Sequence, residues 1–196
     1  MHFIQGYLLV LYVTFLLYLV GKTMLFQMKT HTNPIMFLKR KNTVESFSWG
    51  MLMLIIVLYG IIIVLTAQGN VVGVTFSMLY HDAVYVVGML LTLVGLAMVI
   101  LAHRHMGLSW RMGIDKEREI QLVTTGIFSV SRNPVYLGII TLAVGMIFLL
   151  QTIVSLVLFF VLLQVIYVVI STEERFLWEK FGEEYGQYVK RVRRFL

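Results

Sequence analysis

The chain has 196 residues, of which 59% are hydrophobic and only 13% are charged. A soluble domain carries roughly 25% charged residues, so this composition indicates an integral membrane protein. The absence of cysteine excludes a disulfide framework, a thiolate metal site and a cysteine nucleophile. The net charge of +6 lies in loops and in the tail, without a basic patch interleaved with aromatic residues, so we expect no nucleic acid partner.

Five apolar runs predict an all-α, polytopic fold with five transmembrane helices. In chain order they cover about residues 3–20, 49–67, 83–102, 134–150 and 152–170. A span needs roughly 20 residues, with a lower limit of about 17, so the first three runs are long enough. The last two are short, and only Leu150-Gln151-Thr152 separates them. They must therefore form a tight antiparallel hairpin, which either spans the membrane or stops short of the far face.

The basic residues predict the orientation of these spans. The 16 Lys and Arg residues divide into 5 in the first loop, 5 in the third loop and 6 in the tail. The second loop, residues 68–82, has none, and neither has the hairpin tip. We also expect no cleavable signal peptide, because no basic residue precedes the first run and no small-residue cleavage site follows it. The N-terminus is therefore expected outside, and the C-terminus in the cytoplasm.

The five runs contain no Asp, Glu, Lys, Arg or His, although ion and proton pathways usually need such groups inside the membrane. A transporter or channel is therefore not expected, and the polar function must lie at the cytoplasmic face, in residues 101–133 and 171–196. We expect no metal site either. His103 and His105 are two residues apart on a helix and so point to different faces.

The third loop contains a candidate anion site and a candidate apolar slot. Asn133-Pro134 is a favoured start for a helix, with Asn as N-cap and Pro in the first turn. This motif either marks a helix start and nothing more, or its exposed N–H groups bind an anion beside Arg132. Gly126 indicates a turn or a close approach of the backbone. Apolar residues next to it either pack on the membrane interface or form a slot for a flat ring: Leu122, Val123, Ile127 and Phe128.

Two carboxylates end the last apolar run. Glu173 and Glu174 either face water at a helix end, with Glu174 paired to Arg175 or Arg132, or one of them binds a cofactor or acts as a general base. After them, apolar residues recur at three- and four-residue steps through 176–196, with charges between them. This pattern predicts a C-terminal amphipathic helix at the membrane interface, which could also form a lid.

At these residues the chain resembles the isoprenylcysteine carboxyl methyltransferase family, which in turn resembles the phospholipid methyltransferases. The matching segments are residues 108–114, 122–128 and 132–138, followed by Glu173-Glu174 and residues 181–185. The resemblance covers about residues 101–196, and the earlier spans are generic. It implies methyl transfer from S-adenosylmethionine, with S-adenosylhomocysteine as the product, and cofactor contacts at Leu122, Val123, Phe128, Asn133, Pro134, Val135, Tyr136 and Glu173.

The chain departs from this family at two positions. Where the family usually has His-Pro, this chain has Asn133-Pro134, and an amide cannot titrate. Where the isoprenylcysteine enzymes have an Arg that contacts the substrate carboxylate, this chain has Val169. Arg132 or Arg175 is the candidate replacement for that Arg.

The resulting hypothesis is a single membrane domain, 1–196, whose part from 101 to 196 binds S-adenosylmethionine. It methylates a lipophilic acceptor that enters from the bilayer, in a bacterial inner membrane or the endoplasmic reticulum. Arg132 and Glu173 are the candidate catalytic residues, and Gly126 and Arg132 join the cofactor contacts. Glu174 and Arg175 are the candidate acceptor contacts. The alternatives are a phospholipid N-methyltransferase and a non-catalytic membrane scaffold of the same fold.

Overall fold

The computed structural model describes residues 2–36, 44–70, 72–75, 82–113 and 121–196. Five basic residues behind the predicted orientation lie outside these ranges: Lys39, Arg40, Lys41, Lys116 and Arg118. The described chain is helical. Its α-helices are α1 (His2–Thr30), α2 (Val44–Ala67), α3 (Asp82–Met106), α4 (Pro134–Leu150), α5 (Ile153–Phe181) and α6 (Glu183–Arg191). Two 3-10 turns, η2 (Gly107–Ser109) and η3 (Gly126–Ser129), lie between α3 and α4.

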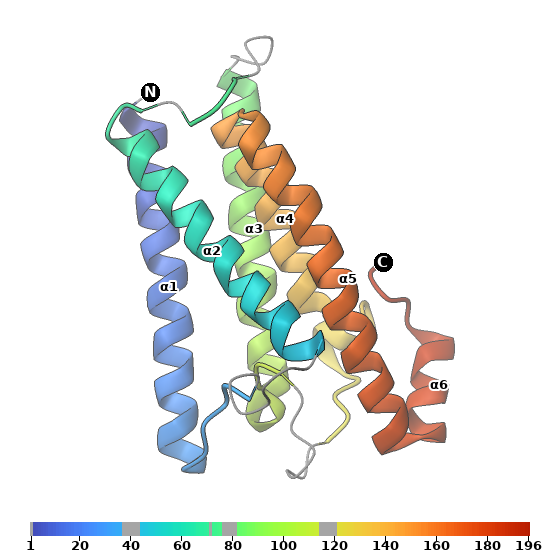
Figure 1. Cartoon of the computed structure of the whole chain (residues 1–196). Helices are drawn as coiled ribbons and strands as arrows, with labels where there is room; N and C mark the ends of the chain where they lie inside the picture. Colours follow the sequence, from blue (N-terminus) through green and yellow to red (C-terminus); the bar gives the residue numbers. More distant parts are fainter. Residues whose placement is uncertain (1, 37–43, 71, 76–81, 114–120) are drawn as a thin grey trace.

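The long helices form a bundle in which α4 packs between α3 and α5, and α2 packs on α5 and α1 (Figure 1). Among the described residues, four helical segments are long and apolar enough to cross a membrane: Phe3–Thr30, Val44–Ala67, Asp82–Ser109 and Ile153–Phe181. Four of the five predicted runs thus lie in helices of the length and composition that a membrane span needs. The fifth, α4, has 17 residues and is about 26 Å long at 1.5 Å per residue, somewhat less than a hydrocarbon core of about 30 Å.

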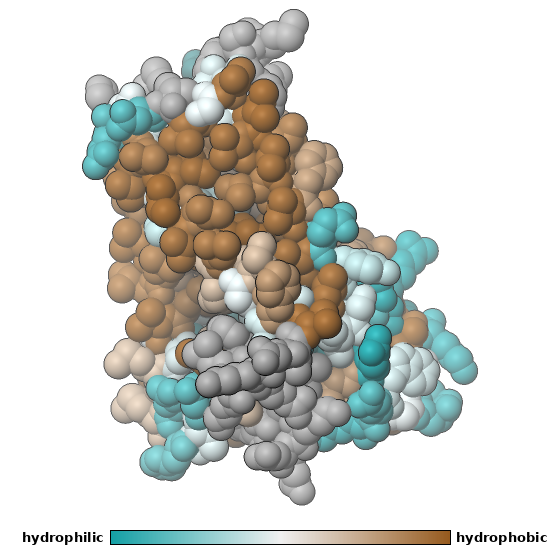
Figure 2. All heavy atoms as spheres, in the orientation of Figure 1, coloured by the Kyte–Doolittle hydropathy of each residue, from teal (hydrophilic) through white to brown (hydrophobic). Residues whose placement is uncertain are grey.

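On the face shown in Figure 2, the bundle is hydrophobic along most of its length, and most of the hydrophilic residues gather at the end that carries α6, with a smaller group at the opposite end. The predicted hairpin is present, because α4 ends at Leu150 and α5 begins at Ile153. Gln151 between them takes a left-handed conformation with φ of 50°, and the Thr152 side chain caps α5 by accepting a hydrogen bond from the Ser155 N–H. This tight turn places both helices antiparallel and directs both of their other ends toward the hydrophilic end of the bundle.

Close approach of α3 and α4 depends on glycines. A Cβ atom on Gly138 would lie 2.8 Å from the backbone oxygen of Gly95, and one on Gly95 would lie 2.6 Å from the backbone oxygen of Gly138. Further along, a Cβ atom on Gly145 would lie 2.6 Å from the methyl carbon of Thr92. Small residues of this kind let helix backbones approach closely inside a membrane. The start of α4 is thereby fixed against the end of α3.

The α5 helix continues well beyond its apolar run, to Phe181 rather than to residue 170. Residues 171–181 are polar but consist mostly of good helix formers, so the backbone remains helical where the hydropathy falls. Glu173 and Glu174 therefore lie within a rigid helix and not at its frayed end. This extension positions both carboxylates over the start of α4.

The chain turns at Gly182, where φ is 50°, and α6 folds back on the protein. Tyr185 and Tyr188 are buried on its inner face, and the hydroxyl of Tyr188 donates a hydrogen bond to the backbone oxygen of Phe128 at 2.6 Å. A helix is thus present where the amphipathic pattern predicted one, and its apolar residues pack on the protein. Its location at a membrane surface stays a prediction.

Candidate functional site

Two adjoining pockets open at the hydrophilic end of the bundle. The loop pocket, of about 660 Å³, lies between the 121–123 loop, the end of α5 and α6. The membrane pocket, of about 760 Å³, extends from the start of α4 between α1, α2 and α3. Six residues line both and define the junction between the pockets: Met106, Arg111, Phe128, Arg132, Asn133 and Glu173. The two pockets therefore meet at these six side chains.

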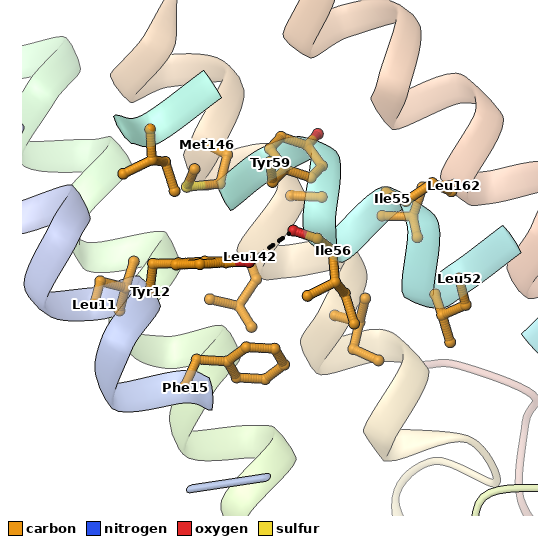
Figure 3. Close-up of a pocket in the computed structure, with 13 residues that line it drawn as sticks. Leu11, Tyr12, Phe15, Leu52, Ile55, Ile56, Tyr59, Leu142, Met146 and Leu162 are labelled. Carbon is orange, nitrogen blue, oxygen red and sulfur yellow. Dashed lines mark hydrogen bonds between the residues drawn. The ribbon is translucent and has the colours of Figure 1, made fainter. Parts of the chain in front are cut away.

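The membrane pocket continues into a third, apolar groove of about 660 Å³. The two share Phe15, Leu52, Ile56 and Ile139 as lining residues. Figure 3 shows the aliphatic and aromatic side chains that converge on this groove from α1, α2, α4 and α5. The hydroxyl of Tyr12 donates its hydrogen bond to the backbone oxygen of Ile56 at 3.1 Å. The groove therefore suits a hydrocarbon chain.

At the junction, Glu173 of α5 is held by Tyr136 of α4. The Tyr136 hydroxyl donates a hydrogen bond to Oε1 of Glu173 at 2.7 Å. Tyr136 is buried, with 5% of its surface exposed, and it lines the membrane pocket, whereas Glu173 lines both pockets. Hydrogen bonds to a carboxylate are stronger than those between neutral groups. One oxygen of this carboxylate is thus fixed, which orients the other.

Glu174 lies at the centre of an ion-pair network with two arginines. Its Oε1 is 3.6 Å from Nη2 of Arg132, and it accepts a hydrogen bond from Nε of Arg194 at 3.3 Å. A second contact joins Arg194 to Oε2 of the same carboxylate, and this bonding raises the pKa of Arg194 above its ordinary value. Of the two pairings considered from the sequence, Glu174 therefore makes the one with Arg132, and the tail supplies Arg194 in addition.

Asn133 begins α4 but does not cap it. The structure places Asn133 at the N-cap position with no hydrogen bond from its side chain to the helix. Its amide donates instead to the backbone oxygen of Arg194 at 3.3 Å and, over 3.4 Å, to Oε1 of Glu174. The sequence predicted that Asn133 would cap α4. It does not, because its amide bonds the C-terminal tail instead. The Asn133 amide consequently ties the start of α4 to both α5 and the C-terminus.

The C-terminal tail is hydrogen-bonded to the segment that precedes α4. The backbone N–H of Arg132 donates to the oxygen of Arg193 at 3.0 Å, and the Ser131 hydroxyl donates to the oxygen of Arg194 at 3.2 Å.

Tyr185 and Tyr188 of α6 line the loop pocket. Burial, together with the charge of Glu174, raises the pKa of Tyr185 to about 12, so this phenol is neutral at physiological pH.

The structure brings most of the residues chosen from the sequence to these pockets, but it divides them. Phe128, Arg132, Asn133 and Glu173 lie at the junction. Leu122, Val123 and Glu174 line the loop pocket, and Pro134, Val135 and Tyr136 line the membrane pocket.

Two of the chosen residues are not among those that line either pocket. Gly126 has a φ of 63°, and a Cβ atom there would collide with the ring of His105. Arg175 is exposed on α5, whereas its neighbour Glu174 is buried. The roles proposed for Gly126 in cofactor binding and for Arg175 in acceptor binding stay predictions.

Arg111 is a site residue that the sequence reasoning did not single out. It lines both pockets, donates from Nη1 to the backbone oxygen of Ser109 at 3.2 Å, and stacks over Phe176 at 5.3 Å from the ring centre. The available signal was a lone arginine next to Trp110 in a short loop after a membrane span. That signal does not distinguish a site residue from a residue that sets orientation.

Comparison with known proteins gives two similarities. The family model described as phospholipid methyltransferase matches residues 83–184, which include nearly all of α3, the whole of α4 and α5, and the junction. Over 78 residues the chain is 44% identical to the protein-S-isoprenylcysteine O-methyltransferase of Saccharomyces cerevisiae. That match covers 39% of this chain and 33% of the yeast protein, so the chain matches about a third of its relative's length.

Proposed function

Because this chain belongs to the phospholipid methyltransferase family, we propose that it methylates a lipophilic acceptor with S-adenosylmethionine at the cytoplasmic face of a membrane. The observation that carries the proposal is the junction, where a loop-side pocket with charged walls meets a pocket that leads into an apolar groove. A water-soluble donor and a membrane-soluble acceptor need separate entrances and one meeting point. The two pockets and their six shared residues supply such an arrangement.

The residues of the loop pocket fit S-adenosylmethionine. Its lining combines charged side chains with apolar ones, and apolar walls with a few placed polar groups are typical of small-molecule sites. Nε of Arg132 is buried and has no hydrogen-bond partner among the described residues, so this guanidinium can still receive a carboxylate. Glu173 suits the amine or a ribose hydroxyl, and Leu122, Val123 and Phe128 suit the adenine ring. We infer that these residues hold the cofactor.

When bound, S-adenosylmethionine supplies an electrophilic methyl group on a sulfonium. The protein holds the acceptor in line with it and excludes water, and positioning of this kind contributes up to about 7–11 kcal/mol to catalysis. Glu173, oriented by Tyr136, orients the donor. Arg132 holds the donor carboxylate, and the membrane pocket and groove hold the apolar part of the acceptor.

The comparisons support two classes of acceptor. The name of the yeast relative points to an isoprenylcysteine-like carboxylate, and the family description points to a phospholipid amine. Val169 is fully buried in the hydrophobic core, with 0% exposed, so no cation reaches the acceptor from that position. Arg111 at the junction is our candidate to meet an acidic acceptor instead. We therefore favour a small lipophilic acid and keep the phospholipid amine as the second candidate.

The domain extent, the orientation and the membrane complete the proposal. We propose one membrane domain over residues 1–196, in which residues 101–196 contain the cofactor site. From the distribution of basic residues among the loops and the tail, we infer that the N-terminus lies outside and that the junction lies on the cytoplasmic side, in a bacterial inner membrane or the endoplasmic reticulum.

The first test is calorimetric titration of S-adenosylhomocysteine into the detergent-purified protein. We expect micromolar binding, reduced at least tenfold by Glu173→Gln and by Asn133→Ala. Arg175→Ala is the matched control, because Arg175 is a charged residue two positions from Glu173 that lines neither pocket. Absence of binding to a folded wild-type protein would contradict the proposal and favour a non-catalytic scaffold. Binding that Glu173→Gln leaves unchanged would contradict the site.

A further inference from the structure

His103 is a buried imidazole on α3 that lines the membrane pocket. Only 5% of the residue is exposed. Along α3, Met106 lines both pockets, whereas His103 and Val99 line the membrane pocket and not the loop pocket. Three residues of α-helix rise about 4.5 Å at 1.5 Å per residue. His103 therefore lies one turn beyond the junction, on the side of the membrane pocket.

Tyr18 of α1 holds the His103 ring in one orientation. The Tyr18 hydroxyl lies 3.1 Å from Nδ1 of His103, and the two rings are stacked with centres 5.8 Å apart and planes 10° apart. Trp110 packs edge-on against the other side of the imidazole at 5.4 Å. One turn along α1, Lys22 donates to the backbone oxygen of His103 at 3.2 Å. The ring is therefore fixed from two directions.

The Tyr18 contact decides which ring nitrogen carries the hydrogen. Tyr18 has no other hydrogen-bond partner among the described residues. A phenolic O–H left without an acceptor at membrane depth is unfavourable, so we assign Tyr18 as the donor and Nδ1 as the acceptor. The neutral imidazole then has its hydrogen on Nε2.

Nε2 of His103 has no partner among the described residues. Because His103 lines the membrane pocket, its Nε2–H is available to a hydrogen-bond acceptor on a ligand in that pocket. Two neighbouring polar side chains of the same pocket are already engaged. Tyr136 bonds Glu173, and Asn133 bonds Glu174 and the tail. His103 therefore offers the ligand a neutral donor, beside the cationic Arg111 and Arg132 that line the same pocket.

We propose that His103 donates a hydrogen bond from Nε2 to an oxygen of the methyl acceptor, with Tyr18 as its positioning residue. The pocket then selects lipophilic acceptors whose head group carries a carboxylate or carbonyl oxygen. A long-chain amine, protonated at neutral pH, offers donors alone and would leave Nε2–H unpaired. This inference rests on the proposed function, because it concerns the acceptor of that reaction.

Tryptophan fluorescence can follow ligands in this pocket. The chain has three tryptophans, of which Trp49 and Trp110 line the membrane pocket. In a Trp178→Phe background, N-acetyl-S-farnesylcysteine and farnesylamine are titrated as a pair of probes that share one hydrocarbon tail. S-adenosylhomocysteine is titrated calorimetrically into the same samples.

We expect His103→Phe to weaken binding of the farnesylcysteine probe by roughly 5- to 10-fold, the usual effect of losing one hydrogen bond. Farnesylamine and S-adenosylhomocysteine should bind as before. Tyr18→Phe, which keeps the ring stack, should give a smaller loss, and His103→Gln, which restores an N–H donor, should recover part of the affinity. His105→Phe is the matched control, since His105 is exposed two residues further along the chain and bonds the backbone oxygen of Leu101.

An unchanged affinity of His103→Phe for the farnesylcysteine probe would overturn the inference. An equal loss of affinity for both probes and for S-adenosylhomocysteine would also overturn it, because such a loss is expected if His103 only anchors α3 to α1. Failure of the wild type to bind either probe would overturn it as well. A further outcome separates the two proposals. If the wild type does not bind S-adenosylhomocysteine but His103→Phe still weakens binding of the farnesylcysteine probe, the hydrogen bond is supported and the proposed reaction is contradicted. The two failures are thus separable.

Discussion

The hydroxyl of Tyr136 donates a hydrogen bond to Oε1 of Glu173 over 2.7 Å and so joins the first turn of α4 to the extension of α5. Tyr136 lines the membrane pocket, and Glu173 lines both pockets. The pair therefore couples the proposed cofactor site to the proposed acceptor site through a single contact. Tyr136 is buried and its hydroxyl bonds a carboxylate oxygen, and such hydrogen bonds are stronger than those between neutral groups.

Tyr136→Phe tests this contact with little change in shape. The phenyl ring can fill the same space, but Glu173 loses the donor that orients it. We expect the affinity for S-adenosylhomocysteine to fall by about 5- to 10-fold, which corresponds to roughly 1–1.4 kcal/mol.

Calorimetry on Tyr136→Phe, Glu173→Gln and the double variant completes a mutant cycle. If the two residues act through one another, the double variant loses little more than Glu173→Gln alone. Fully additive losses would show that the hydrogen bond does not orient the carboxylate.

A second prediction concerns Glu174, which forms ion pairs with two arginines. Glu174→Gln leaves Arg132 and Arg194 without their anion, and the Arg132 side chain is only 12% exposed. Breaking a buried ion pair from one side typically costs about 3–5 kcal/mol. Arg194→Ala should be milder, by about 1 kcal/mol, because Arg194 is 38% exposed and Glu174 retains Arg132.

Thermal unfolding in detergent, followed by circular dichroism, can rank these variants. Arg191→Ala is the control for a surface arginine, since Arg191 is exposed and bonds within its own helix. The expected order of destabilisation is Glu174→Gln, then Arg194→Ala, then Arg191→Ala. A larger effect for Arg194→Ala than for Glu174→Gln would mean that the tail, not the carboxylate, organises the network.

The sequence predicted the spans well because hydropathy is a local property that adds up along the chain. It also predicted that residues near 122–136 and Glu173 would meet, since alternating spans return the loops to one face. The sequence could not predict the end of α5. Between 171 and 181 the chain is polar and helix-forming at once, so the loss of hydropathy hid the continuation of the helix.

Contacts that depend on one turn or on the tilt of one helix were also beyond the sequence. The pairing of Glu174 with Arg194 requires the positive φ of Gly182, which folds α6 back over the junction. The pairing of Tyr18 with His103 bridges residues 85 apart and depends on how α1 leans on α3. Spacing along the chain carries no information about either.

A third prediction tests the close packing of α3 on α4. A Cβ atom at Gly138 would lie 2.8 Å from the backbone oxygen of Gly95, which cannot move aside as a side chain could. Gly138→Ala should therefore force the helices apart and destabilise the protein by roughly 1–3 kcal/mol. Because the start of α4 would shift relative to Met106, S-adenosylhomocysteine binding should weaken as well.

Gly50→Ala is the matched control for that change, because a Cβ atom there meets nothing within 4 Å. Alanine is favoured over glycine inside a helix, so this variant should be as stable as the wild type or slightly more stable. Thermal unfolding and calorimetry on both variants are the measurements. Equal stability of Gly138→Ala and Gly50→Ala would show that the helices do not pack closely at Gly138.

A fourth prediction uses the titration of Tyr185, which reports whether α6 is docked. Burial raises the pKa of this phenol to about 12 from an ordinary value of about 10. Because the pKa is raised in the folded state, Tyr185 contributes its full share to stability below pH 10 and loses it as the pH rises through about 12. The tyrosinate absorbance near 295 nm, taken as the difference between wild type and Tyr185→Phe, should therefore have its midpoint near pH 12. A midpoint near pH 10 would mean that Tyr185 faces water and that α6 does not cover the loop pocket.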